Sequence, residues 1–122
     1  MTDVLVIEDD TDIRTLIVSK LRRLGCSVRQ AATGEAGVSE LEQVPDLLVL
    51  DVLLPGIDGW EVLRRLRAGP ETRELPVLVL SIERPTSTPG LDPGEFLAKP
   101  FSSRAFEDAV QRLLDGATDR EG

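Results

Sequence analysis

The chain has 122 residues, 41% hydrophobic and 30% charged, a size and composition that suit one compact domain, 1–122. Its formal net charge of −8 opposes non-specific adhesion to nucleic acid or anionic lipid, because both are polyanions. The absence of histidine removes the commonest general base and zinc ligand, and the single cysteine excludes an internal disulfide and favours the cytoplasm. We expect no membrane span, no output domain, and a disordered charged tail over 115–122.

Apolar strand-like runs alternate with segments of helical period, and the first half of the chain shows this well. It predicts strands at 3–8, 27–31 and 46–51. A helix is expected to start near Asp10 or Thr11 and to end at Gly25. One face of this helix is apolar: Ile13, Leu16, Ile17, Leu21 and Leu24. A weaker helix is expected from about 33 to 43, with Ala36 and Leu41 facing inward.

The second half of the chain continues the alternation. The sequence Asp58-Gly59-Trp60-Glu61 has the form of a capping box and predicts a helix that buries Val62, Leu63 and Leu66. Strands are expected at 77–81 and 95–98. Ser102 or Ser103 caps a last helix, which ends at Gly116 and has an inner face of Phe106, Ala109, Val110 and Leu113. Three prolines and two glycines lie between 82 and 95 and make a regular helix there short or absent.

Alternating strands and helices predict a doubly wound α/β fold, with a parallel sheet covered on both faces. In such sheets the functional groups gather beyond the carboxyl ends of the strands. Charged or hydroxyl side chains stand at or just past these ends: Glu8, Asp9, Asp51, Ser81 and Lys99. We therefore expect these residues to meet in one shallow pocket.

Together, these residues resemble the receiver domain of bacterial two-component response regulators. The resemblance covers nearly the whole chain, from Glu8-Asp9-Asp10 through Asp51 and the loop 54–59 to Ser81 and Lys99-Pro100-Phe101. It implies a five-stranded flavodoxin-like sheet of order 2-1-3-4-5. The fourth helix of that fold falls in the proline-rich segment, so it is expected to be short or absent here.

The resemblance also implies a Mg²⁺ site. Asp9 and Asp51 would bind the ion directly, the Leu53 backbone carbonyl would supply a third oxygen, and Glu8 would act through water. Crowded carboxylates repel and need a cation, and hard divalent ions prefer oxygen ligands. Taken alone, the acids after the first strand could be ordinary first-turn acids of a helix, and Asp10 is assigned that role.

The implied reaction is phosphoryl transfer to Asp51 from a phosphohistidine on a partner histidine kinase or phosphotransfer protein. A carboxylate nucleophile needs no general base, which suits a chain without histidine. Lys99 and Ser81 would contact the phosphoryl oxygens, and Ser81 and Phe96 would rearrange as the switch. Such a domain is a self-phosphorylating signalling switch and not a turnover enzyme.

Further expectations concern the output of the domain and the alternative functions. The partners are expected to be the kinase and an unidentified downstream protein, with no direct nucleic-acid binding and no membrane, and the chain is expected to be a monomer or weak homodimer. Leu53 cannot orient water beside Asp51, which predicts slow self-hydrolysis and disfavours an aspartyl phosphatase, a class that has an acid at that position. A degenerate receiver that acts only as a docking module remains the alternative function.

Overall fold

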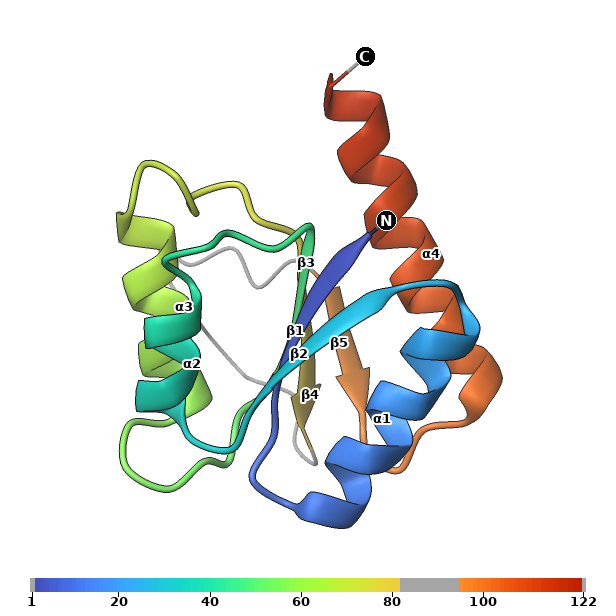
Figure 1. The fold of residues 1–122 in the computed structure, drawn as a ribbon, viewed down its shortest axis with the longest axis horizontal. Helices are drawn as coiled ribbons and strands as arrows, with labels where there is room; N and C mark the ends of the chain where they lie inside the picture. The colour runs from blue at the N-terminus through green and yellow to red at the C-terminus, as the bar shows by residue number, and fades with distance from the viewer. Residues whose placement is uncertain (1, 82–94, 122) are drawn as a thin grey trace.

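In the computed structural model, which describes residues 2–81 and 95–121, a five-stranded parallel sheet has the order β2-β1-β3-β4-β5 (Figure 1). The predicted doubly wound fold is therefore confirmed. The elements follow the chain as β1 Asp3–Ile7, α1 Thr11–Arg23, β2 Ser27–Ala31, α2 Gly34–Glu40, β3 Leu47–Asp51, α3 Gly59–Ala68, β4 Val77–Ser81, β5 Glu95–Ala98 and α4 Ser103–Glu121.

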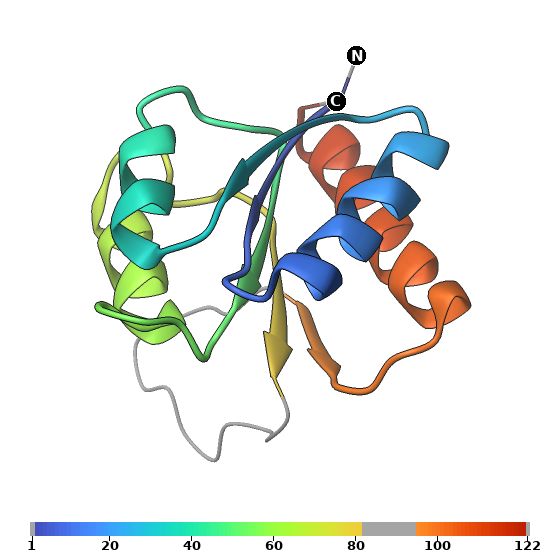
Figure 2. The ribbon, with the colours of Figure 1, turned by 60° about the horizontal axis from the view of Figure 1, so that its bottom comes forward.

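Helices cover both faces of the sheet, with α1 and α4 on one side and α2 and α3 on the other (Figures 1 and 2). Alternate residues of the central strands point to opposite faces. Val49 therefore packs in a cluster with α1 and α4, whereas Leu48 and Leu50 pack in a second cluster with α3. Every residue of β3 and β4 is buried, which explains their continuous apolar sequences.

Side-chain caps begin the helices close to the edge of the sheet. The Asp10 carboxylate accepts hydrogen bonds from the backbone N–H groups of Asp12 and Ile13, at 2.9 and 3.1 Å. Asp58 accepts from Glu61 N–H at 2.9 Å, and Ser102 accepts from Ala105 N–H at 3.0 Å. These caps satisfy N–H groups that lack partners within a helix, so the predicted helix starts were placed well.

Two predicted inward-facing residues lie on the surface instead. Leu16 is 53% exposed, and Ala36 is also exposed. In α2 the inner side is formed by Gly34 and Gly37, because the helix lies so close to the sheet that a Cβ atom on Gly37 would overlap the Ile7 side chain. The glycines that made this helix look weak are what allow its close packing.

The last helix is longer than the sequence indicated. It continues past Gly116 to Glu121, so the predicted end at Gly116 is wrong and residues 115–121 are helical. A glycine inside a helix costs only about 1 kcal/mol and is a weak stop. By contrast, Gly25 has a φ of 89° and follows the end of α1, as expected of a glycine that terminates a helix.

The expectation of a short or absent helix in the proline-rich segment falls on 82–94, which lies outside the described residues. Within the described part of the chain, no helix combines the length and the apolar character needed to cross a bilayer.

Candidate functional site

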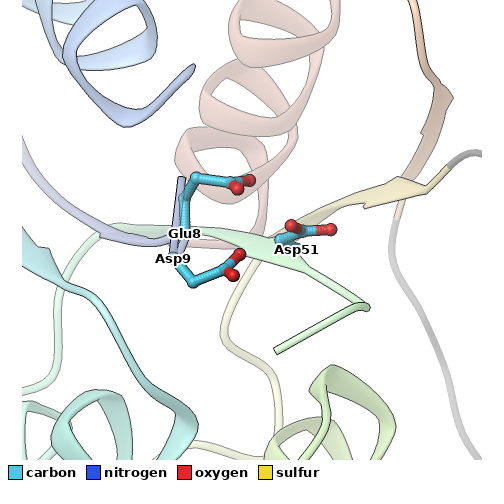
Figure 3. A group of neighbouring side chains, drawn as sticks. All are labelled: Glu8, Asp9 and Asp51. Carbon is cyan, nitrogen blue, oxygen red and sulfur yellow. The ribbon is translucent and has the colours of Figure 1, made fainter. Parts of the chain in front are cut away.

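Three acids from two neighbouring strands meet at the carboxyl edge of the sheet (Figure 3). Glu8 and Asp9 follow β1, and Asp51 is the last residue of β3, which pairs directly with β1. One carboxylate oxygen from each of the three lies within 4.8 Å of the others. The predicted meeting of these side chains is therefore seen, and it follows from the parallel register of β1 and β3.

Two of the three acids are buried. Glu8 is 1% exposed and Asp51 is 4% exposed, whereas Asp9 faces solvent. Buried carboxylates are costly unless a cation or hydrogen-bond donors accompany them. Lys99 supplies one cation, with its Nζ 3.2 Å from Glu8 Oε2 and 3.2 Å from Asp51 Oδ2. The predicted ammonium thus contacts the predicted acceptor.

Backbone contacts between β4 and β5 hold Lys99 in place. The Lys99 N–H donates to the Ser81 carbonyl at 2.8 Å, and the peptide bond between Lys99 and Pro100 is cis. Ser81 itself ends β4 and is 5% exposed, so its hydroxyl lies on the strand next to Asp51. Phe96 lies within β5, half-buried against the cluster on the α2 and α3 side of the sheet.

The balance of charge in this pocket is negative. Burial, followed by the hydrogen bond and the charge of Asp51, raises the pKa of Glu8 to about 7, although the Asp10 N–H and Lys99 oppose the rise. Burial also disfavours the Lys99 ammonium, but Asp51 and Glu8 outweigh it and raise the Lys99 pKa. One ammonium therefore does not compensate three acids, and a further cation fits the site.

The donor set suits a hard divalent ion. Carboxylate oxygens from Glu8, Asp9 and Asp51 gather in one place, and hard cations such as Mg²⁺ take oxygen ligands. Leu53 follows Asp51 in the loop 52–58, here called the acceptor loop, and its N–H donates to Asp51 Oδ1 at 3.3 Å. Its side chain is 60% exposed, so the isobutyl group lies at the solvent-facing rim of the site.

Two residues that brace the site gave no signal in the sequence. Arg14 of α1 donates from Nη1 to the Glu8 carbonyl at 2.7 Å and from Nε to Gln30 Oε1 at 3.2 Å. Glu35 of α2 accepts a hydrogen bond from the Ile57 N–H of the acceptor loop at 2.8 Å. Both are exposed or half-exposed helix residues of ordinary type, and only the tertiary fold shows what they contact.

Two relatives have sequences similar to that of this chain. The chain is 42% identical to the transcriptional regulatory protein AfsQ1 of Streptomyces coelicolor, over 93% of this chain and 52% of that protein. It is 37% identical to the DNA-binding dual master transcriptional regulator RpaA of Synechocystis, over 93% of this chain and 49% of that protein. The chain therefore spans about half the length of these relatives.

These relatives correct the expectation about partners. The negative charge of the chain predicted no direct nucleic-acid binding, but both relatives are named as transcriptional regulators and one as DNA-binding. The net charge of −8 describes only these 122 residues, and the relatives are about twice as long. The exclusion of nucleic acid was therefore wrong, because the net charge of 122 residues does not report on what regulators of this kind bind.

The fold comparison agrees with the sequence comparison. The receiver domain of the sensor histidine kinase PA1611 from Pseudomonas aeruginosa, solved with a magnesium ion coordinated in its active-site cleft, superposes with a TM-score of 0.83. The two chains are 28% identical, and the match covers 93% of this chain and 98% of the other. Residues 4–111 match the response regulator receiver domain family. This chain accordingly belongs to the receiver domains of response regulators, the signalling modules of two-component systems.

Proposed function

We propose that this domain is a phosphorelay switch that accepts a phosphoryl group on Asp51 from the phosphohistidine of a partner kinase or phosphotransfer protein. The observation that carries the proposal is the placement of the buried Asp51 carboxylate beside two other acids and 3.2 Å from the Lys99 ammonium. Such a pocket stabilises the negative charge of a transferring phosphoryl group through positioned cations.

The transfer requires little covalent chemistry from the protein. An Asp51 oxygen attacks phosphorus, a P–O bond forms, and the P–N bond to the donor imidazole breaks. The leaving nitrogen keeps the electron pair and takes up a proton from solvent. Because the nucleophile is a carboxylate, no general base is needed, which fits a chain without histidine.

The residues around Asp51 divide the remaining work. Asp9, Asp51 and the Leu53 carbonyl would hold Mg²⁺, with Glu8 acting through water. When bound, the ion supplies positive charge to the acids and to the transferring oxygens. Lys99 pairs with a further phosphoryl oxygen, and the Ser81 hydroxyl donates a hydrogen bond to the phosphorylated state. Support comes from the all-oxygen donor set and from the magnesium ion of the Pseudomonas receiver domain.

The output of the switch is proposed to reach DNA. Ser81 lies on β4, the strand next to the acceptor strand β3, and Phe96 lies on β5, one strand further out; both would change position when Asp51 carries phosphate. Because the relatives are transcriptional regulators, we propose that this change controls a DNA-binding effector. The single cysteine is consistent with placing this chemistry in the cytoplasm.

The deciding experiment is incubation with Mg²⁺ and acetyl phosphate or phosphoramidate, followed by intact mass spectrometry. The parent domain is expected to gain one phosphoryl group only when Mg²⁺ is present, and Asp51→Asn is expected to gain none. No gain by the parent domain under saturating donor and Mg²⁺ would reject the switch and favour a phosphorylation-independent docking module.

A further inference from the structure

The acceptor loop carries the proposed carbonyl ligand, and its Leu54 and Ile57 side chains pack against the cluster on the α2 and α3 side of the sheet. Its first residue is tied to the sheet, since the Val52 N–H donates to the Leu80 carbonyl at 3.2 Å. Its far end is tied by the Gly59 N–H, which donates to the Val52 carbonyl at 2.8 Å. Between these points Leu53, Pro55 and Gly56 are exposed to solvent. The position of the Leu53 carbonyl therefore depends on this packing and on what hydrogen-bonds to the backbone in the middle of the loop.

A contact from α2 holds that middle part. Glu35, in the first turn of α2, accepts the Ile57 N–H through Oε1 at 2.8 Å across a sequence separation of 22 residues. Gly56 has a φ of 75°, and a Cβ atom there would come within 2.9 Å of Glu35 Oε2. The carboxylate thus fits against a bare stretch of backbone that only glycine provides.

The backbone of α2 reinforces the same contact. A Cβ atom on Gly34 would lie 2.6 Å from the Ile57 carbonyl oxygen and 2.5 Å from Ile57 Cγ1. Gly34 therefore lets the backbone of α2 approach Ile57, and Gly56 lets the acceptor loop approach the Glu35 carboxylate. The Ile57 N–H, together with the N–H of Glu35 itself, lowers the Glu35 pKa, so the carboxylate is a charged acceptor at neutral pH.

We propose that Glu35 is a positioning residue for the phosphoryl-acceptor site: by accepting the Ile57 N–H, it fixes the acceptor loop and so the Leu53 carbonyl that completes the oxygen set for the divalent ion. This inference rests on the proposed function of the site. It gives α2 a role in the chemistry, although the acids that gather at the site come from β1 and β3. Residues that orient ligands from behind commonly affect metal affinity when they are changed.

The test compares Glu35→Ala with Glu35→Gln, which keeps an acceptor oxygen in nearly the same place but removes the charge. Glu42→Ala, an exposed acid beyond the end of α2, is the matched control. Mg²⁺ affinity is measured by calorimetry, hydrogen exchange of the Ile57 amide by NMR in the metal-free domain, and Tm by thermal unfolding.

Glu35→Ala is expected to weaken Mg²⁺ binding about tenfold and to speed Ile57 exchange by a similar factor, the lower end of what one lost hydrogen bond to a charged acceptor implies. Glu35→Gln is expected to stay within about twofold of the parent for both, and Glu42→Ala to match the parent. A Glu35→Ala domain with a lower Tm but parental Mg²⁺ affinity and Ile57 exchange would overturn the proposal, because Glu35 would then only stabilise α2.

Equal impairment of Glu35→Ala and Glu35→Gln would also overturn it, since the charge and not the hydrogen bond would then matter. Neither the calorimetry nor the exchange measurement needs phosphate. A parent domain that binds Mg²⁺ but takes no phosphoryl group would therefore defeat the proposed function without deciding the role of Glu35.

Discussion

The two loops that bring acids to this site are held in different ways. The acidic loop, 8–10, is short, runs straight into α1 through the Asp10 cap, and is braced by Arg14 on its carbonyl side. The acceptor loop, 52–58, is longer and is held by contacts from separate elements, Gly59 of α3 and Glu35 of α2. The first loop is therefore fixed mainly by local sequence and the second mainly by the tertiary fold.

The strongest way to disturb the acceptor loop is a methyl group on Gly59. A Cβ atom there would lie 2.7 Å from Val52 Cα and would overlap the Asp51 carbonyl, both of which are backbone and cannot move aside cheaply. We expect Gly59→Ala to destabilise the domain by about 2 to 3 kcal/mol in urea unfolding, as overpacking does. Gly116→Ala is the control, because no atom lies within 4 Å of its added Cβ. That variant should be stabilised by about 0.5 to 1 kcal/mol.

The acidic loop is tested by pH. In the metal-free domain the Glu8 pKa is raised from 4.5 to about 7 by burial and by Asp51, so the folded state holds this proton more tightly than the unfolded chain. This group therefore contributes stability at low pH that is lost as the pH rises from about 4.5 to about 7, on the order of 3 kcal/mol at most. A bound Mg²⁺ would favour the ionised Glu8 carboxylate, so the Mg²⁺-induced rise in Tm should be larger at about pH 8 than at about pH 6.

Because the chain lacks histidine, few other side chains titrate in this window. Glu8→Gln should remove most of the pH dependence of the Mg²⁺ effect. An equal rise in Tm at both pH values in the parent domain would contradict the assignment of this dependence to Glu8.

The brace on the acidic loop can be removed separately. Arg14→Ala loses the hydrogen bonds to the Glu8 carbonyl and to Gln30, and we expect a loss of about 1 kcal/mol in the free energy of unfolding. The exposed Arg23→Ala, near the end of the same helix, is the charge-matched control and should change the free energy by less than about 0.5 kcal/mol. Similar losses in both variants would show that net charge, and not the brace, is responsible.

The smallest change in stability is expected at the rim of the site. Leu53 is 60% exposed, so Leu53→Asn should alter the free energy of unfolding by less than about 0.5 kcal/mol. If the domain is phosphorylated as proposed, the amide can orient water where the isobutyl group cannot, and the phosphate lifetime should shorten several-fold. The lifetime is measured by intact mass after the donor is removed. An unchanged or longer lifetime would mean that Leu53 does not limit hydrolysis.

The same contrast between local and tertiary control explains what the sequence could predict. The strands at 27–31, 77–81 and 95–98 have the bounds that their apolar patterns indicated, and the acids met because parallel strands end at a common edge. Asp10 and Asp58 were recognisable as caps because capping depends on neighbours two or three residues away.

The predictions that failed concern residues whose position depends on distant parts of the chain or on small differences in free energy. Leu16 fits the apolar stripe of α1. Other apolar residues of α1 fill the space against the sheet and α4, which leaves Leu16 at the surface. Ala36 was predicted to face inward, but Gly37 forms the inner side of α2 because it lets the helix approach Ile7 closely. Nothing in the local sequence indicates this close approach. The contact between Glu35 and Ile57 joins residues with no periodic relation, so no pattern could indicate it.

The division of the interior by the sheet has a practical consequence. Val18 packs only in the cluster with α4, and Val62 only in the cluster on the opposite face. Truncating either one to alanine should therefore leave the energetic cost of truncating the other almost unchanged, as for independent sites. The two halves of the core can therefore be redesigned separately: the cluster beside α2 and α3 can be replaced while the other cluster keeps its native packing.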